Sequence, residues 1–120
     1  LVLWLAHFAH RNTKGNLGYM AVIAFWISFE YIHLNWDLEW PWLTLGNGFA
    51  NSVKWIQWYE FTGTLGGSFW VLAVNILILK FIFTYLQKSR FNRKTVFSGA
   101  VLVFVLIVPL VVSIVQYSWL

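Results

Sequence analysis

Three long apolar segments separated by polar connectors dominate the pattern of the chain. They cover residues 17–34, 66–86 and 96–117, and each contains few charged side chains. A bilayer core about 30 Å thick is crossed by a helix of about 20 such residues. A shorter apolar run at residues 1–9 has the length of part of a fourth span. The pattern predicts an all-α fold, a polytopic transmembrane helix bundle fragment with three full spans and part of a fourth.

The composition agrees with a membrane location. Of the 120 residues, 60% are hydrophobic and 10% are charged, whereas roughly 25% are charged in an average soluble domain. A small chain cannot bury so much apolar surface, because its surface is large relative to its volume. Lipid does not tolerate open sheet edges, so helices are expected even in the β-branched segment 96–117. The chain starts with Leu1 rather than Met, and we interpret it as a piece of a larger membrane protein.

The net charge of +4 comes from basic residues clustered in two connectors. Arg11 and Lys14 lie in the first connector, and the last contains Lys88, Arg90, Arg93 and Lys94. The middle connector, residues 35–65, has one lysine against three acidic residues. Because basic loops stay in the cytoplasm, the middle connector and the C-terminus are predicted to face outward. We interpret the basic clusters as topogenic signals near anionic lipids, not as a nucleic-acid site.

The middle connector is rich in tryptophan and in residues with special backbone properties. Five of the nine tryptophans fall in it: Trp36, Trp40, Trp42, Trp55 and Trp58. Tryptophan prefers the membrane–water interface, Pro41 ends any helix that approaches it, and Gly46 allows a turn. Two interpretations remain open, a tryptophan belt with a turn or the wall of a lipid-binding cavity. Residues 49–61 are predicted to form a short interfacial helix with Asn51 or Ser52 as its N-cap.

Polar residues inside the predicted spans are candidates for function. Glu30 lies about one turn from the outer end of its span, where an ionisable group is costly, and His33 follows on the same helix face. The two side chains either line the mouth of a cavity or form an interfacial pair in water. Asn75 predicts an interhelical hydrogen bond. Lys80 is expected to extend toward the cytoplasmic end of its helix, and Pro109 to bend the third full span.

Several kinds of chemistry are excluded by residue types. The chain contains no cysteine, which excludes disulfides, thiolate metal sites and a cysteine nucleophile within it. His7 and His10 have no partner at ligand spacing, so no metal site is expected. The sequence also contains no glycine-rich phosphate loop and no Ser-His-Asp arrangement. We therefore predict neither a metal nor a cofactor.

Residues 25–79 resemble the membrane part of bacterial apolipoprotein N-acyltransferases. In that family a glutamate near the end of a span is followed eleven residues later by Pro-Trp-Leu, and Glu30 and Pro41-Trp42-Leu43 have this spacing here. An apolar residue, a glycine and a Gly-rich start of the next span follow, here Leu45-Gly46 and residues 63–69. Many members carry arginine three residues after the glutamate, where this chain has His33.

The resemblance implies an enzyme that moves an acyl chain from a phospholipid, through a thioester, to the amino group of a diacylglyceryl-cysteine at a lipoprotein N-terminus. Members carry a Glu-Lys-Cys triad in a periplasmic nitrilase-like domain before the last span. This chain has no cysteine, so it alone would not be catalytic and would be the membrane scaffold, from the end of the fourth span to the seventh. Expected partners are the phospholipid donor, the diacylglyceryl lipoprotein acceptor and membrane lipids, without nucleic acid.

The resemblance also implies a location in the bacterial inner membrane, with the connector 35–65 and the C-terminus on the periplasmic side. The orientation predicted from the charges is the same. The residues expected to bind substrate are Glu30, His33, Trp40, Pro41, Trp42 and Gly46.

Two other functions remain as alternatives. One is a fragment of a secondary transporter or channel, in which Glu30, His33 and Asn75 line a polar path; transporters of this kind often show internal repeats, and this chain shows none. The other is a non-enzymatic membrane anchor. An anchor has no need for a connector crowded with tryptophan, proline and glycine.

Overall fold

The structure is a computed structural model that describes residues 2–12, 16–37, 43–88 and 93–119. Within these ranges, all regular elements are helices. They are the α-helices α1 (Val2–Asn12), α2 (Leu17–Leu34), α3 (Tyr59–Lys88) and α4 (Arg93–Tyr117), and the short 3₁₀ helices η2 (Leu45–Phe49) and η3 (Val53–Trp55). The predicted all-α fold is confirmed for the part of the chain that the structure describes.

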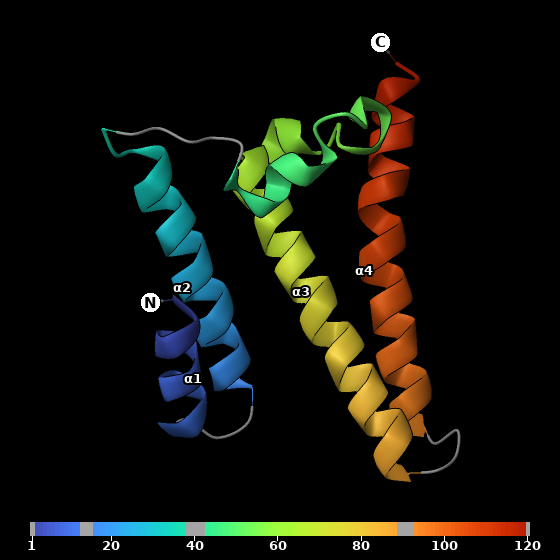
Figure 1. Ribbon diagram of the computed structural model, residues 1–120. Coiled ribbons are helices and arrows are strands. Elements are labelled where there is room, and N and C mark those ends of the chain that lie inside the picture. Colours follow the sequence, from blue (N-terminus) through green and yellow to red (C-terminus); the bar gives the residue numbers. More distant parts are fainter. Residues whose placement is uncertain (1, 13–15, 38–42, 89–92, 120) are drawn as a thin grey trace.

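The helices are arranged as two neighbouring pairs (Figure 1). α1 packs against α2, and α3 packs against α4. η2 and η3 lie at the upper end of α3 and α4 in this view, the end at which the chain reaches its C-terminus. The molecule measures 45 × 39 × 18 Å. Since a helix with its side chains is about 10–12 Å across, this thickness leaves room for little more than one layer of helices.

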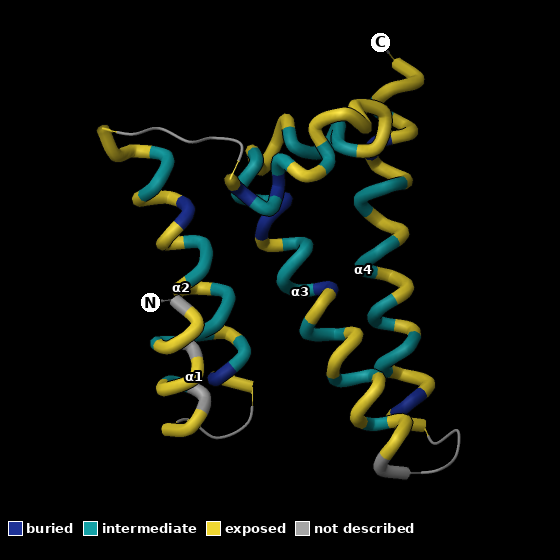
Figure 2. Tube along the Cα trace, viewed as in Figure 1, coloured by how far each residue is buried: buried dark blue, intermediate teal, exposed yellow. Residues whose placement is uncertain are grey.

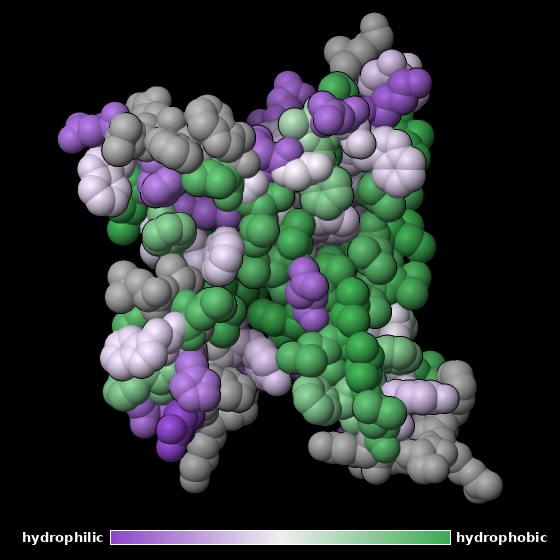
Figure 3. Space-filling view, viewed as in Figure 1, coloured by the Kyte–Doolittle hydropathy of each residue, from purple (hydrophilic) through white to green (hydrophobic). Residues whose placement is uncertain are grey.

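Three helical segments are long and apolar enough to cross a membrane, Leu17–Leu34, Tyr59–Leu86 and Arg93–Tyr117. Few of their residues are buried within the chain: 11% of the most apolar window in the first and 6% in each of the others. Exposed positions recur along all of these helices (Figure 2), and the surface of α3 and α4 is largely hydrophobic (Figure 3). Such a surface suits lipid or further spans of a longer protein rather than water.

α3 begins earlier than the predicted span, at Tyr59 rather than at residue 66. Its first turn is separated from the long apolar part by Gly63, where φ is 66° and ψ is −174°. This conformation is essentially restricted to glycine, because a Cβ atom makes it strained. Gly63 is therefore the point at which the chain turns from the connector into the span.

Pro109 joins α4 to α3. It lies inside α4 and lacks the N–H that would bind the carbonyl of Val105, four residues earlier. The indole Nε1 of Trp70 on α3 donates a hydrogen bond to that carbonyl at 2.8 Å. The sequence alone predicts only a bend at this proline, whereas the structure shows that the freed carbonyl is an acceptor for the neighbouring helix.

Lys80 lies near the end of the molecule opposite η2 and η3. Its Nζ donates a hydrogen bond to Oδ1 of Asn16, at 2.8 Å, and lies 4.9 Å from the ring centroid of Tyr19. Asn16 directly precedes α2, four residues after the end of α1, whose last turn contains Arg11. The ammonium group thus extends toward the end of the bundle that the basic residues mark, as expected from the sequence.

Among the described residues, Asn75 does not make the interhelical hydrogen bond that the sequence predicts. The side chain is exposed, and its Nδ2 donates to the carbonyl of Val71, one turn earlier in α3, at 2.8 Å. The helix backbone therefore satisfies the amide locally, as polar side chains in spans often do when no neighbour is in reach.

The helix predicted over residues 49–61 is also wrong in its extent. η3 covers only Val53–Trp55, and Ser52 at its N-cap makes no side-chain hydrogen bond. The reason lies in α4, where the hydroxyl of Ser113 donates to the carbonyl of Trp55 at 2.9 Å. The backbone N–H of Trp58 in turn donates to the same hydroxyl at 3.5 Å. The connector is bound to α4 at this point, so its backbone does not need to continue as a helix.

Candidate functional site

The connector is attached to α3 through the backbone of Gly46. The Gly46 N–H donates to the hydroxyl of Ser68 at 2.9 Å, and the Tyr59 hydroxyl donates to the Gly46 carbonyl at 2.9 Å. Ser68 is 0% exposed, so its bond to Gly46 lies away from solvent, whereas the bond from Tyr59 is partly buried. Two side chains of α3 thereby hold the peptide groups on either side of one glycine.

The contact between η2 and α3 is too close for larger residues. A Cβ atom added to Gly46 would overlap the backbone carbonyl of Thr64. A Cβ atom added to Gly67 would overlap the Tyr59 hydroxyl and would lie 3.0 Å from the Cα atom of Gly46. Small residues allow this kind of approach between membrane segments. The sequence shows a Gly-rich start of this span, at residues 63–69, but does not reveal that its close partner is η2.

Glu30 attaches the same connector to α2. It is 3% exposed, and its Oε1 atom accepts two hydrogen bonds, from Nε1 of Trp26 at 2.9 Å and from the backbone N–H of Leu45 at 2.9 Å. Two donors offset part of the cost of removing a carboxylate from water. Its other oxygen, Oε2, is buried and has no hydrogen-bond partner among the described residues. Glu30 is thus a bridge between the end of α2 and the start of η2.

His33 lies beside Glu30 on α2 but does not bond to it in the described part of the chain. Its ring stacks on Phe29, with the centroids 5.5 Å apart and the planes at 21°. His33 and Glu30 line one small cavity of about 110 Å³, together with Phe29, Leu34, Leu43 and Thr44. Asn75 is not among its lining residues, which gives no support to a polar path shared by these three side chains.

The remaining predicted substrate-binding residues, Trp40, Pro41 and Trp42, lie outside the described residues. What the structure describes is the anchorage directly after them, where Leu45 binds Glu30 and Gly46 binds Tyr59 and Ser68. Sequence reasoning missed Trp26, Tyr59 and Ser68. The only signal for Trp26 is its spacing four residues before Glu30, which places both on one helix face.

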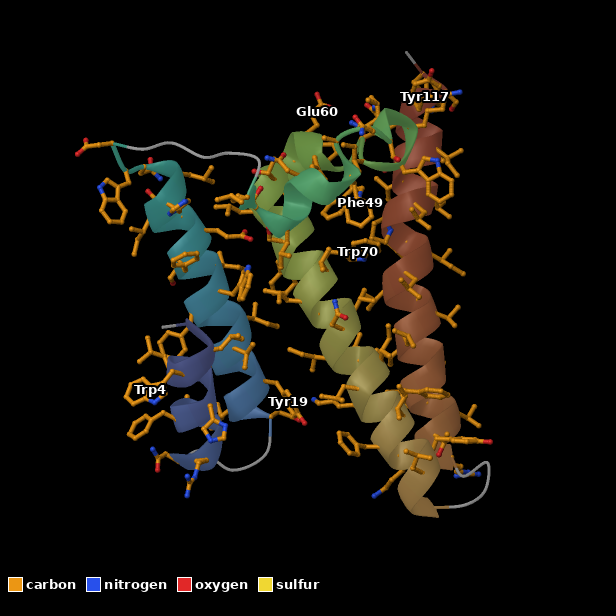
Figure 4. All side chains as sticks on the ribbon, in the orientation of Figure 1. Trp4, Tyr19, Phe49, Glu60, Trp70 and Tyr117 are labelled. Atoms are coloured by element: carbon orange, nitrogen blue, oxygen red, sulfur yellow. The ribbon has the colours of Figure 1, made fainter. Side chains whose placement is uncertain are left out.

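A second, larger hollow lies between the connector, α3 and α4, and we call it the aromatic cavity. It has a volume of about 330 Å³ and is lined by Phe49, Ser52, Trp55, Ile56, Trp58, Tyr59, Trp70 and Leu110. Three aromatic rings of its wall make edge-to-face contacts. The centroid of the Trp70 ring lies 5.7 Å from that of Phe49 and 6.2 Å from that of Trp58. Figure 4 shows Phe49 and Trp70 close together between α3 and α4, beneath the connector.

No metal site is supported by the described residues. The ranges 2–12, 16–37, 43–88 and 93–119 contain no group of three metal-ligating His, Asp or Glu residues. Two ionisable side chains of the described part of the connector contact α4 instead. Glu60 accepts a hydrogen bond from Gln116, and Nζ of Lys54 lies 5.2 Å from the ring centroid of Tyr117. Both contacts attach the connector to the last turns of α4.

The fold and the site together define a polytopic membrane protein whose tryptophan-rich connector is folded back onto its spans. Residues 1–77 match the family model described as the apolipoprotein N-acyltransferase N-terminal domain. This match covers more than half of the chain, so the chain belongs to the apolipoprotein N-acyltransferase family. The resemblance inferred from Glu30 and the Pro-Trp-Leu motif is confirmed at the level of the family.

A curated relative agrees with the family match. The apolipoprotein N-acyltransferase of Chlorobaculum tepidum is 33% identical over 75 residues, which are 62% of this chain and 14% of that protein. The chain thus matches only a small part of the length of this relative. No solved structure matches the chain.

Proposed function

We propose that this chain is the membrane scaffold part of an apolipoprotein N-acyltransferase. In the full protein, an acyl chain would pass from a phospholipid to the N-terminal diacylglyceryl-cysteine of a lipoprotein. The family match supports the assignment, and the three membrane-spanning helices suit a reaction in which donor and acceptor are both lipids. The location would be the bacterial inner membrane, with the connector 35–65 on the periplasmic side.

The chemistry would be carried out elsewhere in the full protein. A cysteine thiolate attacks the phospholipid ester, the lysophospholipid leaves, and a thioester forms. The amino group of the acceptor then attacks the thioester, and the thiolate is released. This chain contains no cysteine, so its part is to hold membrane-embedded surfaces in place rather than to form the covalent intermediate.

One observation carries this proposal: the carboxylate of Glu30 binds the backbone N–H of Leu45 at 2.9 Å. In the sequence, Leu45 follows Pro41-Trp42-Leu43 after one intervening residue, Thr44. The bond therefore ties the start of η2, which lies just after this family motif in the sequence, to the outer end of α2. A connector fixed in this way offers a constant surface at the membrane boundary, which is what positioning of a lipid substrate requires.

The test is acyl transfer to a diacylglyceryl lipopeptide by the full-length protein carrying Glu30→Ala. Removal of the carboxylate leaves the Leu45 N–H without its acceptor and frees the start of η2 from α2. We expect kcat/KM to fall about tenfold or more, since an unsatisfied buried donor costs ~1–3 kcal/mol. Glu30→Gln, which keeps an acceptor oxygen, should lose less.

Glu60→Gln is the matched control. Glu60 is also a carboxylate of the connector, but it is exposed and accepts a hydrogen bond from Gln116 rather than from the backbone of η2. Its transfer activity should equal that of the unmodified protein. Full activity in a correctly folded Glu30→Ala protein would contradict the proposed role of this bridge.

A further inference from the structure

We propose that the aromatic cavity binds an acyl chain of a bilayer phospholipid, as a lipid site within the scaffold. The inference rests on the proposed function in one respect only. The proposed function assigns the connector that covers the cavity to the periplasmic side, and this decides which leaflet of the bilayer supplies the lipid. The argument uses the chemistry of the wall, its volume and its position on the spans.

The wall of the cavity is mainly apolar, and two of its polar side chains are already bound inside the chain. Trp70 uses its Nε1 on the carbonyl of Val105, and Tyr59 uses its hydroxyl on the carbonyl of Gly46. Below the connector, Ser113 binds the carbonyl of Trp55. With these groups bound inside the chain, the wall presents mainly aromatic and aliphatic surface. A hydrocarbon is the chemistry that gains most from such a surface, because every contact removes apolar area from a polar environment.

The size of the cavity fits part of a single alkyl chain. Its volume is about 330 Å³, and a water-sized group occupies about 30 Å³ of a liquid. Roughly ten groups of this size would fill it. A complete two-chain lipid with its head group is much larger, so the cavity would take one chain and leave the rest of the lipid in the bilayer.

The position of the cavity favours a bilayer lipid over other hydrocarbon sources. Leu110 lines it from α4. Neighbouring side chains on the same helix, Ile107, Val111 and Ile114, are 50–63% exposed, on a segment that is apolar enough to span a membrane. The cavity therefore lies beside an exposed apolar surface of α4, and where that surface meets the bilayer, phospholipid is the most abundant hydrocarbon. Figure 3 shows that hydrophobic residues cover α3 and α4 in this view.

The experiment is photolabelling of the full-length protein in phosphatidylcholine vesicles. A trace of phosphatidylcholine carries a diazirine midway along one acyl chain, and labelled residues are mapped by mass spectrometry after irradiation. We expect Trp70 and Leu110 to be labelled several-fold more than Phe104, which is 66% exposed on α4 and does not line the cavity. As the amount of probe lipid is increased, labelling of the two cavity residues should reach a plateau, whereas labelling of Phe104 should continue to rise.

A variant that fills the cavity tests the site directly. Leu110→Trp places a larger apolar side chain in the wall, and loss of room for about two methylene groups should lower Trp70 labelling about tenfold. Phe104→Trp, the matched control on the same helix, should leave Trp70 labelling unchanged. If Leu110→Trp reduces the yield of folded protein, Ile56→Phe provides the same test from the connector side.

Three results would overturn the proposal. The first is equal, non-saturating labelling of Trp70 and Phe104. The second is crosslinking of the cavity residues to another protein segment in place of lipid. The third is labelling of the cavity by a diazirine-bearing diacylglyceryl lipopeptide but not by the phospholipid. Photolabelling does not depend on turnover. Acyl transfer measured on the same unmodified protein therefore shows separately whether the proposed function holds.

Discussion

At the scale of single residues, the glycines of the connector differ in what they permit. Gly46 lies against the backbone of α3, where a Cβ atom would overlap the Thr64 carbonyl, while a Cβ atom on Gly48 would meet nothing within 4 Å. A backbone carbonyl inside a helix cannot move aside as a flexible side chain can. Gly46 and Gly48 therefore differ in role. Gly46 is required for the close contact with α3, whereas a side chain at Gly48 would meet no neighbour.

This difference gives a matched pair of substitutions. Gly46→Ala should destabilise the protein by ~1–3 kcal/mol, because overpacking of a close contact forces the backbone apart, while Gly48→Ala should leave stability unchanged. The measurement is thermal unfolding of the full-length protein in detergent, combined with limited proteolysis of the connector. Equal stability and equal cleavage in the two variants would show that η2 is not held against α3.

At the scale of elements, α3 and α4 are connected by a proline whose missing donor is replaced across the helix interface. Trp70 satisfies the carbonyl of Val105 that Pro109 leaves open. The same tryptophan contacts Phe49 of η2 and Trp58 of the connector. One side chain thus joins the two spans and the connector, at the wall of the aromatic cavity.

A double-mutant cycle measures this contact. Trp70→Phe should cost more stability in the natural background than in Pro109→Ala, because the alanine introduced there would supply its own N–H to the Val105 carbonyl and make the indole donor redundant. The expected coupling energy is ~1 kcal/mol, the net value of one hydrogen bond. It is read from denaturant or thermal unfolding of the four proteins, and strict additivity would argue against the bond.

At the scale of the whole molecule, opposite ends of the bundle have different chemistry. One end carries Arg11 and the bond between Lys80 and Asn16. At the other end, the connector meets the last turns of α4 through Glu60 and Lys54. The charge asymmetry read from the sequence therefore corresponds to two physical ends of one layer of helices (Figure 1).

The orientation of these ends is testable with single cysteines, since the chain has none of its own. Ser52→Cys, in the exposed part of the connector, should react in intact cells with a membrane-impermeant maleimide, and Asn12→Cys should react only after the membrane is opened. The parent protein, labelled in parallel, corrects for cysteines elsewhere in the full-length chain. The opposite labelling pattern would reverse the proposed topology.

Much of the fold and part of the site could be predicted from local sequence. Length and hydropathy are properties of each segment, so the three long apolar helices were predictable. Glu30 stands out in the sequence as a charge near the end of a span, and Gly46 stands out through the family resemblance; that they bind substrate stays a prediction. Tyr59 and Ser68 could not be found, because a hydroxyl in a helix reveals nothing about which backbone group it will bind. The same reason explains the error at Asn75, whose amide turned back to its own helix.

The sequence by itself determined that the long segments suit lipid rather than water, that they form helices, and that they resemble the acyltransferase family. These properties depend on composition and on short motifs along the chain. Only the tertiary structure decided how the connector is held: Glu30 on the N–H of Leu45, Ser68 and Tyr59 on Gly46, and Trp70 on the carbonyl freed by Pro109. These bonds join residues 13 to 35 positions apart. Their partners are chosen by which backbone groups are left without donors or acceptors once the helices pack, and no single segment contains that information.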